Sequence, residues 1–352
     1  DPDLPIHVHS HDTAGIAVAS MLACAEAGAD VIDAAIDSMS GLTSQPSMGA
    51  IVSSLEQMEL GTGISHDSIQ RLNLYWSEVR QLYQCFEQNV KASDSSVFDH
   101  EMPGGQYTNL MFQSQQLGLG SQWSEIKHAY MEANMLCGDI VKVTPSSKVV
   151  GDLAQFMVAN KLSARDVEEH ASTLDFPVSV VEFFQGFLGT PPGGFPEPLR
   201  THIIRNKERV DTRRGASLPP LDFDKIKSDL TVKYRRPMSE CDAVSWAMYP
   251  KVFEEFQAFI EEFGDLSRMP TRFFLGKPKA GEEMHIPIED GKLLIVKLLG
   301  LGPFHEATGM RDALFELNSS PRSISVKDLS ASVEEVHHEK ATSEPGSVGS
   351  PL

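Results

Sequence analysis

Three histidines stand at alternate positions near the start of the chain, in the run Ile6-His7-Val8-His9-Ser10-His11-Asp12-Thr13. Side chains two residues apart on a β-strand share a face, so the three imidazoles point to the same side. A neutral imidazole carries one donor and one acceptor, and both need partners when the ring is buried. The row therefore has two interpretations, hydrogen-bonded core histidines or ligands of a divalent cation. At the C-terminal end of a strand we favour the metal or catalytic role.

A second run with reactive side chains is Val141-Lys142-Val143-Thr144-Pro145-Ser146-Ser147-Lys148. Thr144 is suited to cap a helix whose first residue is Pro145, and this structural interpretation alone accounts for the Thr-Pro pair. Lys148 would then be a solvent-facing residue of the first turn. The alternative is that the Thr144 hydroxyl and the Lys148 ammonium, one turn apart at a helix start, face a ligand.

The elements around the histidines predict where they lie. Residues 14–27 are rich in alanine and predict a helix, which Gly28 should end. Residues 31–36 then predict a second strand. A strand, a helix and a strand in close succession form a parallel βαβ unit, whose functional residues lie where strands end and loops begin.

The next region, from about Ser53 to His202, has a helical pattern, and the region beyond residue 271 has a β-rich one. We expect a helix opened by residues 65–68, and a tight turn at 102–107 before a helix at 108–117. Further along, we expect an N-cap in 162–168 and a helix at 178–188. An extended linker at 214–221 and a helix from Pro250 to Phe263 should follow. Short strands are expected at 272–275, 283–288, 292–297, 313–317 and 323–326, with a hairpin at Asp290-Gly291. Residues 331–352 have the composition of a flexible linker.

Composition excludes several classes of protein. The net charge of −19 argues against a nucleic-acid-binding surface. The four cysteines show no C-x-x-C spacing, so we expect free thiols in a reducing compartment, the cytoplasm with the mitochondrial matrix as the alternative. No apolar run approaches the ~20 residues that span a bilayer, so we expect a soluble chain without a membrane partner. The chain starts close to its first strand and ends in the linker, so we expect further sequence at both ends.

Several runs carry a resemblance to a known family. They are residues 9–15 (HSHDTAG), 37–47 (DSMSGLTSQPS), 103–110 (PGGQYTNL), 142–148 (KVTPSSK) and 194–198 (GFPEP). Together they resemble the carboxyltransferase part of the pyruvate carboxylases, and the resemblance extends from residue 1 to about Asp328.

The resemblance implies an α/β fold, the C-terminal part of a (β/α)8 barrel followed by a helical funnel and a small β-rich α+β domain. It implies the last barrel strands at 1–52, the funnel at 53–214, a linker and helix at 215–270 and a tetramerisation and allosteric domain at 271–329. Residues 330–352 would lead to a biotin-carrier domain beyond the chain.

The resemblance also implies the site residues. His9 and His11 correspond to ligands of the barrel metal, zinc or manganese, while His7 is expected in the core. Thr144 corresponds to the threonine that shuttles a proton between pyruvate and biotin, and Lys148 to a lysine near the biotin ring. The other metal ligands, an aspartate and a carbamylated lysine, and the arginine that holds pyruvate would belong to earlier strands.

The implied activity is that of a ligase, the ATP-dependent carboxylation of pyruvate to oxaloacetate for anaplerosis and gluconeogenesis. Biotin would be carried on the absent domain, and ATP would be used by an absent biotin-carboxylase domain. The parent enzyme would be a homotetramer activated by acetyl-CoA, with Arg322 near the activator. One departure is Ser319 after Asn318, where the family often has glycine, and we expect it to alter that turn.

Two further hypotheses stay open from the sequence. The chain resembles oxaloacetate decarboxylase and transcarboxylase subunits in the barrel and in the run 144–148, although the β-rich module favours the carboxylase. The third hypothesis is a fragment that is inactive alone because it lacks most barrel strands.

Overall fold

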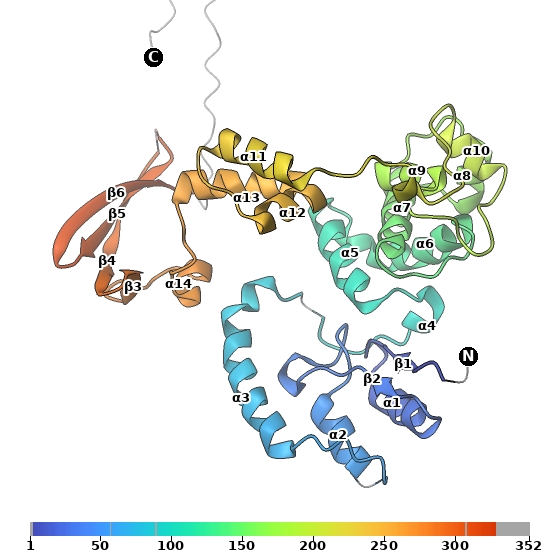
Figure 1. Cartoon of the computed structure of the whole chain (residues 1–352), viewed down its shortest axis with the longest axis horizontal. Helices are drawn as coiled ribbons and strands as arrows, with labels where there is room; N and C mark the ends of the chain where they lie inside the picture. Colours follow the sequence, from blue (N-terminus) through green and yellow to red (C-terminus); the bar gives the residue numbers. More distant parts are fainter. Residues whose placement is uncertain (1–2, 57, 89, 307, 329–352) are drawn as a thin grey trace, which may run out of the picture. The chain divides into compact units, whose positions relative to one another are not determined.

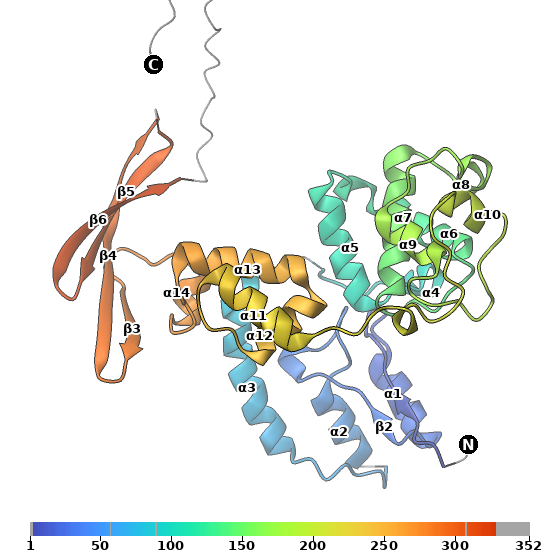
Figure 2. The ribbon, with the colours of Figure 1, turned by 45° about the horizontal axis from the view of Figure 1, so that its top comes forward.

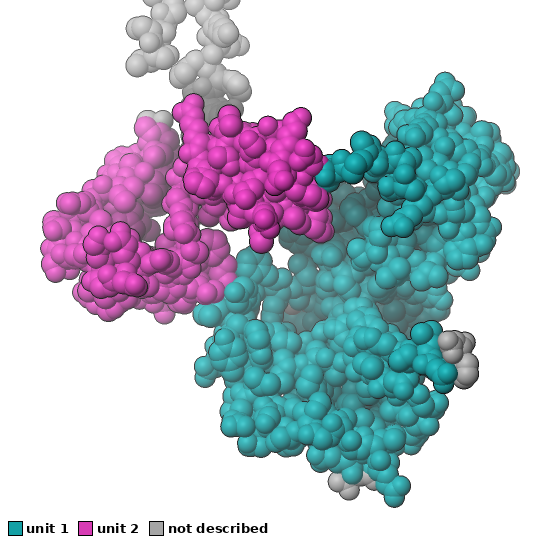
Figure 3. All heavy atoms as spheres, viewed as in Figure 1, with its two compact units in different colours: residues 1–221 teal, residues 222–352 magenta. Residues whose placement is uncertain are grey.

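The structure, a computed structural model, describes residues 3–328 except 57, 89 and 307. The chain forms two compact units, residues 1–221 and residues 222–352, coloured separately in Figure 3. The linker expected at 330–352 lies outside the described residues. We describe each unit by itself.

The first unit is mainly helical and begins with two short strands (Figure 1). Its elements are β1 (His7–Val8), α1 (Ala17–Glu26), β2 (Val31–Ile32), α2 (Met48–Glu56), α3 (His66–Leu82), α4 (Val97–His100), α5 (Gly104–Gln116), α6 (Trp123–Leu136), α7 (Ser146–Asn160), α8 (Ala164–His170), α9 (Val178–Gln185) and α10 (Leu199–Ile204).

The predicted parallel βαβ unit is confirmed. β1 pairs in parallel with β2, with His7 opposite Val31 and Val8 opposite Ile32. Both strands are shorter than the sequence indicated, and α1 starts at Ala17, where the amide donates to the side chain of Asp12. Gly28 follows the end of α1 with φ of +99°, a conformation that glycine adopts without steric penalty. A small apolar core, with buried Met21, lies between these strands, α1 and α2.

The helical remainder of the unit has a separate and larger core. It contains the fully buried side chains of Tyr130 and Phe184, and α6, α7, α8, α9 and α10 gather around it (Figures 1 and 2). The predicted caps hold, since Ser65 caps α3 and Ser163 forms a capping box at α8. The prediction of a turn at 102–107 was wrong, because α5 already begins at Gly104.

The second unit combines three packed helices, a short helix and a sheet. Its elements are α11 (Phe223–Tyr234), α12 (Glu240–Met248), α13 (Pro250–Phe263), α14 (Thr271–Leu275), β3 (Glu283–Glu289), β4 (Lys292–His305), β5 (Met310–Leu317) and β6 (Ser320–Lys327). Leu230, Met238 and Phe253 form the core of the first three helices. The predicted helix from Pro250 to Phe263 is confirmed. The segment 214–221 contains one 3₁₀ turn and ends at the boundary between the units.

The four strands form an antiparallel sheet in the order β3-β4-β5-β6 (Figure 2). The hairpin at Asp290-Gly291 is confirmed, and Gly291 has φ of +75°. The turn between β5 and β6 places both Asn318 and Ser319 in the left-handed region, with φ of 45° and 67°.

The strand predicted at residues 272–275 was wrong. These residues form α14, whose N-cap is Pro270. The amides of Phe273 and Phe274 both donate to the carbonyl of Pro270, so a turn that starts at the proline takes the place of strand pairing.

Candidate functional site

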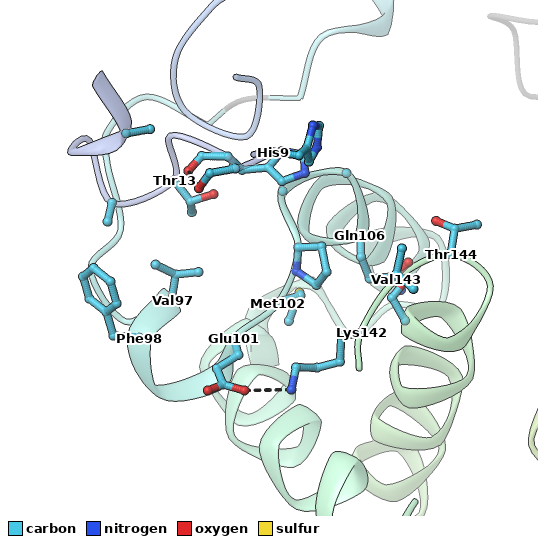
Figure 4. Close-up of a pocket in the computed structure, with 18 of the residues that line it drawn as sticks. His9, Thr13, Val97, Phe98, Glu101, Met102, Gln106, Lys142, Val143 and Thr144 are labelled. Atoms are coloured by element: carbon cyan, nitrogen blue, oxygen red, sulfur yellow. Dashed lines mark hydrogen bonds and ion pairs between the residues drawn. The ribbon is translucent and has the colours of Figure 1, made fainter. Parts of the chain in front are cut away.

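A pocket of about 710 Å³ lies in the first unit and is lined by three separate parts of the chain (Figure 4). They are the end of β1 with the start of α1, the corner between α4 and α5, and the segment just before α7. Its polar lining residues include His9, His11, Thr13, Glu101, Gln106, Asn109, Lys142 and Thr144. The structure therefore brings Thr144 to the same pocket as His9 and His11, although more than 130 residues separate it from the two histidines in sequence.

The two histidine rings are held by their Nδ1 atoms. His9 Nδ1 lies 2.7 Å from Asp33 Oδ2, and His11 Nδ1 lies 2.8 Å from the carbonyl oxygen of Thr43. The carbonyl can only accept, so His11 donates from Nδ1, and the neutral ring keeps a lone pair on Nε2. Metal-binding histidines are usually oriented by such a bond from the other nitrogen. The rings lie edge to face with centroids 5.2 Å apart, and both residues line the pocket.

His7 was expected in the core, and this expectation was wrong. Its side chain is 57% exposed, and its Nε2 lies 2.7 Å from the second oxygen of Asp33. Asp33 therefore bridges His7 and His9, and the hydrogen bonds from these two imidazoles lower the pKa of its carboxyl group. A role for Asp33 was not expected from the sequence, although its place directly after β2 was a usable signal. Its amide donates to the carbonyl of Val8.

The first turn of α5 is seated against His11. A Cβ atom on Gly104 would lie 2.5 Å from His11 Nδ1 and still closer to the carbonyl oxygen of Thr43. Position 104 therefore requires glycine because the backbone approaches the histidine closely. Nearby, the hydroxyl of Thr13 lines the pocket and is buried without a hydrogen-bond partner among the described residues.

Thr144 does not cap a helix, so the interpretation that the sequence favoured was wrong. Pro145 occupies the N-cap position of α7, and no side chain caps that end. Ser146 takes over the local bonding, since its Oγ accepts from the amide of Val143 and donates to the carbonyl of Val141 at 2.7 Å. The Thr144 side chain lines the pocket instead (Figure 4).

The structure does not bring Lys148 into the lining of this pocket. Its Nζ lies 2.5 Å from Asp152 Oδ2, which also accepts from Ser179. The lysine that lines the pocket is Lys142, whose Nζ lies 2.7 Å from Glu101 Oε2. The hydrogen bond from Lys142 lowers the pKa of the Glu101 carboxyl group. Neither Glu101 nor Lys142 was expected from the sequence, although Lys142 lies two residues before Thr144.

Among the described residues, no group of three or more histidine, cysteine, aspartate or glutamate side chains is placed to hold a metal ion. His9 and His11 fit as two imidazole ligands of a larger set. None of the described helices combines the length and apolar character that crossing a bilayer requires. The four cysteines are free thiols, as predicted, and burial raises the pKa of the Cys137 thiol to about 12.

Comparison with known proteins gives concordant matches. Residues 97–297 match the family described as a conserved carboxylase domain. The pyruvate carboxylase of Aspergillus niger is 55% identical over 352 residues, and that of Pichia angusta is 55% identical over 353 residues. The chain belongs to the pyruvate carboxylase family.

Solved structures of this family agree with the fold. The carboxyl transferase domain of Rhizobium etli pyruvate carboxylase matches with a TM-score of 0.83 and 43% identity, over 93% of this chain and 55% of that domain's chain. The same domain with pyruvate and biocytin matches with a TM-score of 0.83 and 42% identity, over 93% and 55%. The α/β fold of this chain is therefore that of the carboxyltransferase part of a pyruvate carboxylase.

The chain spans less than a third of the length of these relatives. The match covers 100% of this chain but 29% of the Aspergillus niger protein and 30% of the Pichia angusta protein. The mitochondrial pyruvate carboxylase of Mus musculus is 49% identical over 100% of this chain and 30% of its own length.

Proposed function

We propose that this chain is the carboxyl-transfer part of a biotin-dependent pyruvate carboxylase and moves CO2 from carboxybiotin to pyruvate, forming oxaloacetate. The observation that carries the proposal is one pocket whose lining includes two oriented imidazoles and Thr144. The Rhizobium etli relative, whose structure holds pyruvate and biocytin, supports this choice of substrate and cofactor.

In this proposal a divalent cation, zinc or manganese, is held by the Nε2 atoms of His9 and His11 together with ligands from the remainder of the barrel. Such a cation, when bound, polarises and orients the oxygen atoms of a 2-oxo acid. The contribution of this chain is orientation, since Asp33 and Thr43 fix the two rings through Nδ1.

Thr144 has the role of proton relay. An aliphatic hydroxyl is a weak acid and a weak base, so it acts only between close partners. In this step the N–CO2 bond of carboxybiotin would break and release CO2, which leaves a basic ureido nitrogen. The Thr144 oxygen would take the proton of the pyruvate methyl group while its own proton passes to that nitrogen. The resulting enolate carbon would then form a bond to the released CO2. The apolar side chains of Val97, Phe98 and Met102 line the same pocket and limit the access of water.

The rest of the assignment follows the family. We propose that residues 1–52 are the last strands of the (β/α)8 barrel, residues 53–214 the funnel, and residues 271–329 the tetramerisation and allosteric domain that responds to acetyl-CoA. Lys148 serves as a second cation near the biotin ring, and its bond to Asp152 breaks when it takes this role. Biotin is carried on a domain outside this chain, ATP is used by a biotin-carboxylase domain outside it, and the enzyme acts in the cytoplasm or the mitochondrial matrix.

A decarboxylase or transcarboxylase subunit is the alternative function. The four-stranded sheet β3-β4-β5-β6 favours the carboxylase, because in that family a β-rich module ties the subunits together. We also propose that the isolated chain is inactive, since it supplies only two of the metal ligands. Purified chain mixed with carboxybiotin and pyruvate should give no oxaloacetate.

The proposal is tested on Thr144 in a full-length version that carries these residues. Thr144→Ala should nearly abolish oxaloacetate formation, and Thr144→Ser should keep part of it, while ATP cleavage by biotin carboxylation continues in both. Thr173→Ala is the matched control, because Thr173 is exposed and donates only to the carbonyl of His170 in its own turn. Near-normal carboxyl transfer in Thr144→Ala would contradict the relay.

A further inference from the structure

Lys142 and Glu101, which line the pocket, form an ion pair in which the lysine is largely buried and the glutamate is exposed. We propose that Lys142 binds the carboxylate group of the ligand in this pocket and that Glu101 is the counter-ion which Lys142 leaves when the ligand enters. The identity of the ligand rests on the proposed function, whereas the exchange of partners rests on the geometry of the pair.

Lys142 is the only lysine or arginine, and Glu101 the only aspartate or glutamate, among the described residues that line the pocket. Figure 4 shows their side chains meeting at one edge of the pocket, joined by the 2.7 Å bond. An anionic ligand in the pocket therefore finds one cationic side chain there, and Glu101 competes with it for that cation.

The burial of the pair is asymmetric. The side chain of Lys142 is 11% exposed, and that of Glu101 is 63% exposed. A buried ammonium group must keep an anionic partner, because an unpaired buried charge is strongly destabilising. An exposed carboxylate returns to water at little penalty, and the bond between such a group and a cation is screened. When a ligand carboxylate replaces Glu101, Lys142 therefore keeps an anionic partner, and the exchange costs little free energy.

Lys142 lies two residues before Thr144, and both residues line the pocket in the segment before α7. Gln106 and Asn109 of α5 line the same pocket and carry amide groups that can donate to a carboxylate. A carboxylate held by Lys142 thus lies in the pocket that Thr144 also lines.

The carboxylate has two sources, the 2-oxo acid itself or the carboxyl group on the biotin ureido nitrogen. Biotin is tethered in the full-length enzyme, so its concentration does not enter the KM for pyruvate. A rise of this KM in a Lys142 variant therefore assigns the contact to pyruvate, and a fall of kcat at constant KM assigns it to carboxybiotin.

The test compares Lys142→Met with Glu101→Gln in a full-length version that carries these residues. Loss of a charge-assisted contact should lower kcat/KM about 10–100-fold in Lys142→Met. Glu101→Gln removes the competing anion and should raise kcat/KM. If the pair is only structural, both variants break the same ion pair and both should fall together. Lys142→Arg keeps the charge and should restore most of the activity.

Two controls separate this inference from the proposed function. Binding of oxalate, measured by calorimetry without turnover, should weaken in Lys142→Met and strengthen in Glu101→Gln. Arg165→Met and Glu169→Gln break an exposed ion pair of the same 2.7 Å length in α8 and should leave both readouts unchanged. Parallel losses in Lys142→Met and Glu101→Gln, or no change in either, overturn the inference. A wild-type enzyme that binds oxalate but forms no oxaloacetate overturns only the proposed function.

Discussion

Replacing Gly104 with alanine tests how α5 is seated against the candidate metal ligand His11. The added Cβ would lie 2.5 Å from His11 Nδ1 and closer still to the carbonyl oxygen of Thr43. Neither group can yield freely, because they are hydrogen-bonded to each other at 2.8 Å. The start of α5, the histidine ring or the Thr43 loop must therefore shift.

The neighbouring Gly105 provides a matched control within the same helical turn. A Cβ on Gly105 meets nothing within 4 Å. Both substitutions gain the helix preference of alanine over glycine, about 0.5–1 kcal/mol. This gain cancels in the difference between the variants, which leaves the steric term of about 1–3 kcal/mol that overpacking causes. We expect Gly105→Ala to raise the free energy of unfolding and Gly104→Ala to lower it.

Urea unfolding of the two variants, together with hydrogen exchange of the α5 amides, measures this difference. In the full-length version, metal content should also fall in Gly104→Ala, because a displaced His11 ring loses the bond that orients it. Equal stabilisation in Gly104→Ala and Gly105→Ala would refute the close seating of α5 on His11.

Three further predictions concern separate parts of the chain. In the full-length version His9→Ala and His11→Ala should each lose metal and carboxyl transfer, whereas His7→Ala should mainly reduce stability. The metal content of each purified variant is the measurement. A wild-type metal content in His11→Ala contradicts the assignment. Burial raises the pKa of Asp94, but hydrogen bonds from Ser96 and Lys127 outweigh it and hold that pKa well below the usual value, so the carboxylate stabilises the fold above about pH 4 and loses this contribution as the pH falls. Asp94→Asn should therefore lower stability at pH 7 and flatten the acid limb of the stability profile. Ser319→Gly should stabilise the second unit by about 0.5–1 kcal/mol in thermal unfolding, because φ of 67° suits glycine, and an unchanged melting temperature would contradict the strained turn.

Local sequence signals predicted local structure well. Pro250 at a helix start, the capping serine at position 163 and the Asp290-Gly291 turn each act within a few residues, and each element formed as expected. The succession of strand, helix and strand within residues 6–36 also predicted the parallel pair of β1 with β2. These features depend on backbone conformation and hydrogen bonds that neighbouring residues determine.

The errors share the opposite property, because contacts distant in sequence decided them. The pair Gly104-Gly105 has the composition of a turn, yet Gly104 is required by its approach to His11. Glu101 and Lys142 are 41 residues apart, and no local pattern joins them. Pairings of this kind depend on the tertiary structure, so a single sequence could not reveal them. The error at residues 272–275 is an exception, because the residue that starts the helical turn there, Pro270, is local in sequence.

The pocket spans two apolar cores that are packed separately. His9 and His11 belong to the part of the first unit that is built on Met21, and Thr144 to the part that is built on Tyr130 and its neighbours. Separate cores tend to open as separate cooperative segments with their own free energies. A ligand that touches both walls joins these segments thermodynamically, because it binds only when both are folded. Bound substrate should therefore slow hydrogen exchange around α1 and α7 together, and the weaker of the two cores should limit how tightly the pocket binds.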